Sequence, residues 1–276
     1  MTLSERNTIF KVGIWFCAIM TLIIIALSFL LIPTYSAIEE NTQRSGTFFK
    51  FITGRLFNTD YLAVHTSIAL AVVFSLISIL LIRSFFESTS AAEIFYFFIF
   101  IISLSFELIR LTLPLYLIRS FPLFYLNVAA RVILFVRFSA IFSLLAASIC
   151  AAGLEIQRVR IVIFVIIIAA LIMSIGVPVD TLAWDTCFNL TIGYTSMYTM
   201  VEVIVSIATI ISFLVAVKVR KVNGYLYVSI GVTAALIGRN ILFGADNWVG
   251  SIVSILLLSF GTWFMCSRLH KIHLWL

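Results

Sequence analysis

The feature that constrains this chain most is its succession of long apolar runs, separated by short polar segments. A helix needs about 20 consecutive apolar residues to cross the hydrocarbon core of a bilayer. Because a helix satisfies its own backbone polar groups, runs of this length predict transmembrane helices. The predicted fold is all-α, a polytopic transmembrane bundle that forms one integral membrane domain over residues 1–276. We expect about eight spans, near residues 10–32, 61–82, 94–118, 123–151, 161–178, 195–217, 225–243 and 249–267.

Composition indicates the same class of protein. Hydrophobic residues make up 63% of the chain and charged residues only 11%, so most of its mass belongs in the bilayer. The net charge of +6 does not indicate a nucleic-acid partner, because the cations lie at the predicted membrane edges or inside spans. The four cysteines are scattered without a CxxC spacing, which predicts neither a disulfide framework nor a metal site.

The orientation is predicted from lysine and arginine, which are enriched in cytoplasmic loops. With both termini inside, the inner segments hold Arg6, Lys11, Arg83, Arg158, Arg160, Lys218, Arg220, Lys221, Arg268 and Lys271, against Arg44, Lys50, Arg55 and Arg119 outside. The predicted location is a bacterial inner membrane, with cytoplasmic termini. One alternative stays open: if the first run were a signal peptide cleaved near Ser36, seven spans and an outside N-terminus would remain.

Charged residues inside the apolar runs are the main functional signal. The stretch SFELIRLTLPLYLIRS places Glu107 and Arg110 three residues apart inside a predicted span. A charge near the bilayer centre costs a few kcal/mol, so such residues usually face a protein interior and mark functional sites. Depths follow from a rise of about 1.5 Å per residue from the middle of each span. They put all of these polar residues between the midplane and the outer surface: Glu107, Arg110, Arg131, Arg137, Glu202, Arg239 and Asn240.

The arginines in this set outnumber the glutamates. Glu107 and Arg110 share a helix face, and Glu107 and Arg137 share a depth on consecutive spans, so both pairs are predicted contacts. Four arginines against two glutamates leave about two positive charges, which favours an anionic ligand, a lipid headgroup or the outer acids Asp180, Asp185 and Asp246.

These charges suit two roles. In the functional interpretation Arg110, Arg131 and Arg239 contact an anion in a pocket open to the outer side, Glu107 and Glu202 orient arginines, and Arg137 pairs with Glu107. In the structural interpretation the ion pairs fix helix register. Arg131 or Arg239 then extends to the outer interface.

Packing expectations follow from the remaining residues of the spans. Gly231, Ala234, Ala235 and Gly238 form a small-residue face in the seventh run, which predicts close approach of another helix. The runs 161–178 and 249–267 contain no charge, so we expect them at the lipid-facing periphery.

The segment FELIRLTLPLYLIRSFPLFYLNVAARVILFVRFSAIFSLLAASICAAGLEIQ resembles the multi-helix membrane sensor regions of bacterial signalling proteins. The resemblance extends over roughly the third to sixth spans and consists of arginine-bearing helices that end in short basic inner loops. It implies a ligand-sensing bundle, and it implies no particular ligand. The tail LHKIHLWL is too short for an output domain, so we expect a separate signalling partner protein.

The function predicted from the sequence is therefore a sensor or accessory subunit that binds a small or lipid-borne anion. A transporter for an anionic solute is the first alternative, although the inner half-spans carry no ionisable residue. A lipid-modifying intramembrane enzyme is the second, with Glu107 or Glu202 as the general base. No cofactor is expected, because no lysine lies inside a span to bind retinal and no pair of histidines is placed to ligate haem.

Overall fold

A computed structural model describes residues 3–40, 56–86, 92–119, 122–153 and 159–274. Its long elements are almost all helical, as the apolar runs predict. In chain order the elements are α1 (Leu3–Glu40), α3 (Tyr61–Phe86), α4 (Ala92–Ser105), the 3₁₀ helix η1 (Phe106–Leu111), α5 (Thr112–Arg119), α6 (Leu123–Ala152), α7 (Val159–Gly176), β1 (Val179–Trp184), β2 (Leu190–Ile192), α8 (Thr195–Arg220), α9 (Gly224–Phe243) and α10 (Trp248–Leu274).

Seven helical segments of the described chain are long and apolar enough to cross a membrane. They are α1, α3, the unit formed by α4, η1 and α5, then α6, α8, α9 and α10. The predicted run 161–178 corresponds to α7, which is apolar but shorter. The structure is therefore all-α, and its seven long apolar helices indicate a multi-pass integral membrane protein.

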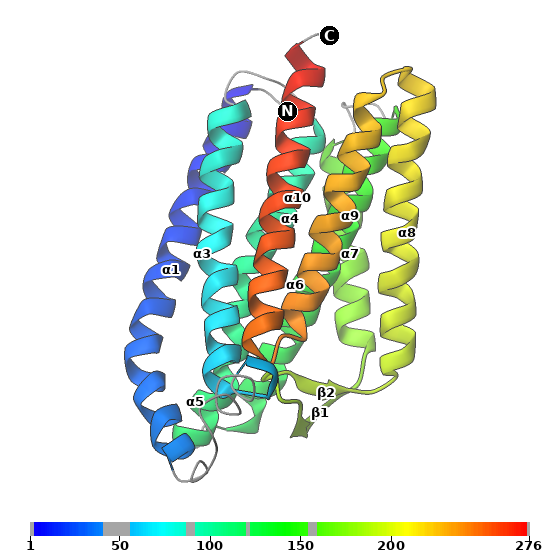
Figure 1. The fold of residues 1–276 in the computed structure, drawn as a ribbon. Helices are drawn as coiled ribbons and strands as arrows, with labels where there is room; N and C mark the ends of the chain where they lie inside the picture. Colours follow the sequence, from blue (N-terminus) through cyan, green and yellow to red (C-terminus); the bar gives the residue numbers. More distant parts are fainter. Residues whose placement is uncertain (1–2, 41–55, 87–91, 120–121, 154–158, 275–276) are drawn as a thin grey trace.

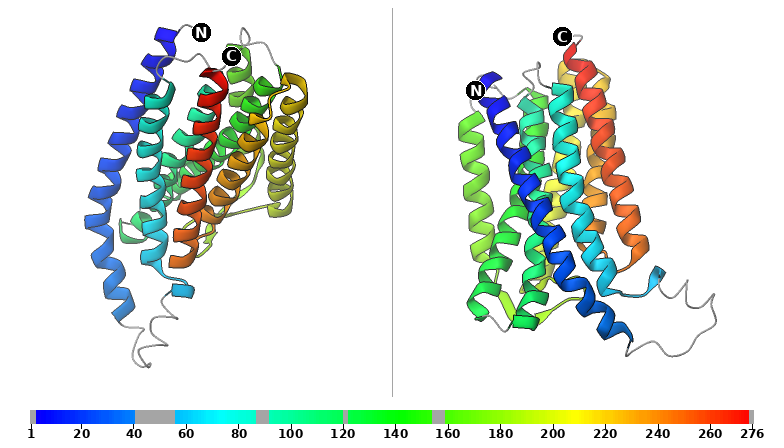
Figure 2. Two further views of the ribbon diagram at one scale, coloured as in Figure 1. Left: turned by 45° about the horizontal axis from the view of Figure 1, so that its top comes forward. Right: turned by 90° about the vertical axis from the view of Figure 1, so that its left-hand side faces the viewer.

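The helices run side by side and alternate in direction (Figure 1). The beginning of α1 and the end of α10 lie at one end of the bundle, called here the terminal end. The strands β1 and β2 lie at the opposite end, called here the hairpin end. Helices α1 and α8 form two opposite edges, and α4 runs between its neighbours in the middle (Figures 1 and 2).

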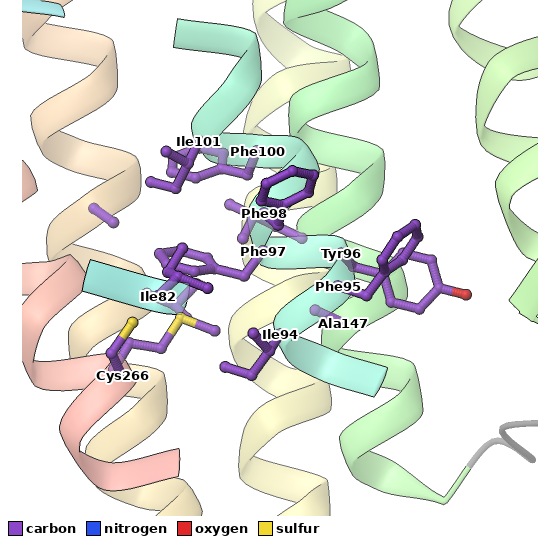
Figure 3. Packing of buried hydrophobic residues seen from close by; sticks show 14 of the residues in the cluster. Ile82, Ile94, Phe95, Tyr96, Phe97, Phe98, Phe100, Ile101, Ala147 and Cys266 are labelled. Atoms are coloured by element: carbon purple, nitrogen blue, oxygen red, sulfur yellow. The ribbon is translucent and has the colours of Figure 1, made fainter. Parts of the chain in front are cut away.

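Helix α4 is the centre of the apolar core. In the span that contains α4, 78% of the residues in an 18-residue apolar stretch are buried. The corresponding share is 17% in α1 and in α8. Its aromatic side chains point outward in several directions, so that Phe97 lies near Ile82 and Cys266 while Tyr96 points the other way (Figure 3). Because large rings bury the most apolar area per residue, this run of phenylalanines stabilises the contacts between α4 and the surrounding helices.

Helices α9 and α10 make the most extensive contact between any two elements. The predicted small-residue face is confirmed there for Gly231, Ala235 and Gly238, which are all buried, whereas Ala234 is only half-buried. A Cβ atom added at Gly261 of α10 would stand 2.5 Å from the carbonyl oxygen of Gly231 and 2.6 Å from the backbone nitrogen of Ala235. The two backbones can approach this closely only because glycine faces them.

The prediction of two peripheral runs is only half right. Helix α7 does expose most of its apolar side chains. Helix α10, however, contacts both α9 and α3 and buries Met265, Cys266 and Leu269 completely. Helix α8 is more exposed than α10, although it carries Glu202. Arg239 of α9 pairs with that charge, and the buried residues of α8 are Thr209, Phe213 and Ala216.

The segment between α7 and α8 contains a β-hairpin that the sequence analysis did not predict. Strands β1 and β2 pair antiparallel, with Val179 opposite Ile192 and an irregularity between Asp180 and Trp184.

Other segments at the hairpin end are joined by hydrogen bonds. The indole nitrogen of Trp248 donates to Asp60 at 2.9 Å, and the backbone nitrogen of Asp60 donates to the carbonyl of Asp246 at 2.9 Å. These bonds join the start of α3 to the connection between α9 and α10.

The close contact of α9 and α10 gives the first prediction. Gly261→Ala lowers the thermal unfolding midpoint of the detergent-purified protein, because the new methyl group meets backbone atoms and overpacking costs about 1–3 kcal/mol. Gly176→Ala is the matched control, since no atom lies within 4 Å of its added Cβ. Equal midpoints for the two variants would contradict this packing.

Candidate functional site

The site begins at a local change of helix type. The residues FELIRL form the 3₁₀ helix η1 rather than a continuation of α4. Pro114 lies four residues after Arg110 and has no backbone N–H to bond the Arg110 carbonyl, so a regular α-helix is interrupted there. Side chains at i and i+3 eclipse in a 3₁₀ helix. Glu107 and Arg110 therefore lie on one face, with 3.5 Å between the carboxylate and the guanidinium, and both are buried.

Glu107 also pairs with Arg137 of α6, as predicted. The guanidinium donates to both carboxylate oxygens, from Nε at 3.0 Å and from Nη2 at 2.7 Å. This bidentate geometry is the strongest arrangement for an arginine and a carboxylate. Nη2 of Arg137 donates in addition to the side-chain oxygen of Asn189 in the hairpin, at 2.9 Å.

A second ion pair joins α8 and α9. Arg239 is fully buried and donates through Nη1 to Glu202 and, at 3.0 Å, to the side-chain oxygen of Asn240. Its Nη2 donates to the backbone carbonyl of Arg137 at 3.1 Å. The ring of Phe243 lies 4.2 Å from the Arg137 guanidinium and 4.5 Å from that of Arg239, so two cation–π contacts connect the ion pairs.

The hairpin contacts the charged cluster at the hairpin end of the bundle. Arg110 donates through Nε to the backbone carbonyl of Cys187 at 3.0 Å, and Nη2 reaches the same oxygen. The turn around that carbonyl is organised by Asp185, which accepts from the backbone nitrogens of Cys187 at 2.9 Å and Asn189 at 2.8 Å. Burial raises the pKa of the Cys187 thiol, so this side chain is a neutral thiol at neutral pH.

Arg131 lies apart from the other predicted residues. Its Nη1 donates to the carbonyls of Ser174 and Ile175 at 3.0 and 2.9 Å, and Ser174 donates back to the Arg131 carbonyl at 2.6 Å. Those carbonyls belong to the last turn of α7, where a helix has no internal donors left. Arg131 therefore caps α7.

The remaining six predicted residues form the connected set called here the ion cluster: Glu107, Arg110, Arg137, Glu202, Arg239 and Asn240.

A pocket of about 310 Å³ adjoins the ion cluster. It lies between α6, the hairpin and the start of α8, and its lining residues are Ala130, Ile133, Leu134, Arg137, Asp185, Asn189, Leu190, Thr191, Ile192, Thr195 and Tyr198. Arg137 is the member of the ion cluster that reaches it. Its Nε and Nη2 are used by Glu107 and Asn189, and within the described chain Nη1 has no hydrogen-bond partner.

The ion cluster carries a smaller charge excess than the sequence predicts. With Arg131 placed elsewhere, three arginines face two glutamates, which leaves one positive charge. Asp185 lies on the rim of the same pocket and supplies a negative charge without an ion pair to any described arginine. The pocket is thus lined by groups of both signs.

Several residues of this region were not singled out from the sequence. Asn189 opens an N-x-T sequon, which predicts a glycosylation acceptor rather than a partner for Arg137, and Tyr198 carries no charge and has no distinctive spacing. At the terminal end, Glu93 is buried as well, 3.8 Å from both Arg220 and His273. Glu93 lies one residue before the predicted run 94–118, so it was not among the charges considered inside spans, although α4 begins at Ala92. Among the described residues, no group of histidine, cysteine and acidic side chains is arranged to hold a metal ion.

The bidentate pair gives the second prediction. Glu107→Ala leaves Arg110 and Arg137 buried without their carboxylate and destabilises the protein by about 3–5 kcal/mol, measured by unfolding in mild detergent. The double variant Glu107→Ala with Arg137→Ala is less destabilised than the sum of the two single variants, because each single change leaves a buried charge behind. Additive losses would show that the two groups are not coupled.

Chemically, the site offers one guanidinium edge, one carboxylate, an amide and hydroxyl groups beside an apolar wall. Such a set is suited to binding and orienting a small polar molecule. Comparison with known family models, curated proteins and solved structures found no match to this chain.

Proposed function

We propose that this protein is a multi-pass sensor or accessory subunit of a bacterial inner membrane, which binds a small or lipid-borne anion in the pocket at its hairpin end. The observation that carries the proposal is the Nη1 edge of Arg137, which has no hydrogen-bond partner among the described residues and belongs to a cluster with one excess positive charge. An arginine edge of this kind suits carboxylate or phosphate.

The other members of the ion cluster position Arg137 in this proposal. Glu107 fixes the guanidinium plane through two bonds, and Arg239 holds the backbone of Arg137 through its carbonyl. Glu202 in turn orients Arg239, the role expected from the sequence. Arg110 and Arg239 are buried and do not line the pocket, so the contact with the anion belongs to Arg137 rather than to them.

The pocket faces the outer side of the membrane in this proposal. Support comes from the basic last turns of α3, α8 and α10, which contain Arg83, Lys218, Arg220 and Lys271 and all lie at the terminal end (Figure 1). Positive charge is retained on the cytoplasmic side. Four residues counted for the orientation, Arg44, Lys50, Arg55 and Arg158, lie outside the described residues.

A binding role is favoured over transport by the packing behind the pocket. Phe138 and Ile141 of α6 and Ala170 of α7 form a buried apolar cluster, with Tyr198, Val201 and Val205 of α8 against it. Beyond the Tyr198 hydroxyl at the pocket, the side chains of this cluster are apolar and offer an anion no polar contact. The separate signalling partner expected from the sequence would read the state of the bundle at the terminal end.

The third prediction concerns the bound anion. Native mass spectrometry of the gently solubilised protein detects a retained anionic adduct in the wild type and in Arg131→Ala. Arg137→Lys loses the adduct, because lysine keeps the charge but has no planar fork to serve Glu107 and a ligand together. An adduct that survives Arg137→Lys and disappears in Arg131→Ala would place the anion elsewhere.

The fourth prediction concerns orientation. All four native cysteines are buried, so a single added cysteine can be labelled over a low background. We expect Trp184→Cys, on the exposed hairpin, to react with a membrane-impermeant maleimide on intact cells. Lys221→Cys, at the other end of α8, should react only after the cells are permeabilised. The reverse pattern would place the pocket on the cytoplasmic side.

A further inference from the structure

We infer that the ligand of the hairpin-end pocket is a small zwitterion, a molecule that carries an anionic group and a protonated amine a few atoms apart. The inference rests on the proposed function, because it uses the same pocket and the same contact at Arg137. It adds a second recognition group, the carboxylate of Asp185.

The first argument is that the two opposite charges line one pocket and are held at a fixed spacing. Asn189 lies between them, since its side-chain oxygen accepts from Arg137 Nη2 at 2.9 Å and its Nδ2 donates to Asp185 Oδ2 at 3.1 Å. One carboxamide therefore separates the guanidinium from the carboxylate. A ligand that meets both groups must carry its own two charges a few atoms apart, as an α-amino acid or an aminoethyl phosphate does.

The second argument is that Asp185 is both fixed and accessible. Three donors hold its carboxylate, the backbone nitrogens of Cys187 and Asn189 and the side chain of Asn189. The residue is nevertheless exposed, and no described cation forms an ion pair with it. A carboxylate accepts about four hydrogen bonds, so one position is left for an ammonium group of the ligand.

The third argument concerns size and polarity. The volume of about 310 Å³ is at the lower end of the range for ligand pockets, which run from about 300 to 1,000 Å³. Apolar side chains of α6 and β2 form one wall, among them Ile133, Leu134 and Leu190, while Thr195 and Tyr198 bring hydroxyl groups. The pocket thus matches a compact molecule with two charges and a short apolar part.

Two sources supply this chemistry, a free amino acid and the headgroup of an amine-bearing phospholipid. The experiment measures binding to the full chain in detergent by ligand-induced thermal stabilisation. Each zwitterion is paired with its analogue lacking the amine: glycine with acetate, alanine with propionate, leucine with isocaproate, and phosphoethanolamine with ethyl phosphate. We expect at least one zwitterion to bind about tenfold more tightly than its partner, the effect of one added charge-assisted hydrogen bond.

Asp185→Asn is the decisive variant. An asparagine side chain still accepts from the two backbone nitrogens through its oxygen, so the turn keeps both of these bonds. Its amide nitrogen cannot accept from Asn189 Nδ2, so the variant removes the charge and that one bond. In this variant the tenfold preference for the zwitterion is lost, whereas the affinity for the matched anion is unchanged or higher. Stabilisation by an amino acid identifies a soluble source, and stabilisation by phosphoethanolamine alone identifies a lipid headgroup; either supports the inference.

Two results would overturn the inference, and they differ in what they say of the proposed function. If each anion binds as tightly as its zwitterion, and Asp185→Asn changes nothing, the pocket binds anions only and the proposed function stands without the zwitterion. If neither compound of any pair stabilises the wild type, and native mass spectrometry finds no retained anionic adduct, both proposals fail.

Discussion

The hairpin-end half of this bundle depends on the bidentate pair between Glu107 and Arg137. The pair joins η1 to α6, places the Arg137 carbonyl where Arg239 can reach it, and directs Nη2 to Asn189 in the hairpin. In a low-dielectric interior each of these charges would cost several kcal/mol alone. Neither ion pair is independent of the other, because Phe243 lies against both guanidinium groups. The hairpin is fixed by the same network through the Cys187 carbonyl.

Much of this could be predicted from the sequence, for a simple physical reason. A charged residue inside an apolar run must face the protein interior, so Glu107, Arg137 and Arg239 were identifiable without any structure. Their common depth followed from the helical rise, and the structure joins them in one cluster. Arg131 shows the limit of that reasoning, because depth along a span does not say in which direction a side chain points. It faces the last turn of α7 instead of the cluster.

The hairpin was the main element that the sequence analysis missed. A short segment between two helices contains strand-like alternation over only a few residues, and the pairing of β1 with β2 depends on a turn organised by Asp185. Asn189 gains its role only when that turn places it beside Arg137. The pocket is therefore a product of tertiary structure: α6 supplies the guanidinium, the hairpin supplies the amide and carboxylate, and α8 supplies the hydroxyl groups.

The central claim is that Arg137 presents a guanidinium edge to a ligand in this pocket. The most direct measurement is a cryo-electron microscopy structure of the protein purified from its native membrane, with an antibody fragment bound at the terminal end. The account predicts non-protein density between α6 and the hairpin, within hydrogen-bonding distance of Arg137 Nη1. It would be contradicted by a structure in which Nη1 bonds to a protein group and side chains fill the pocket.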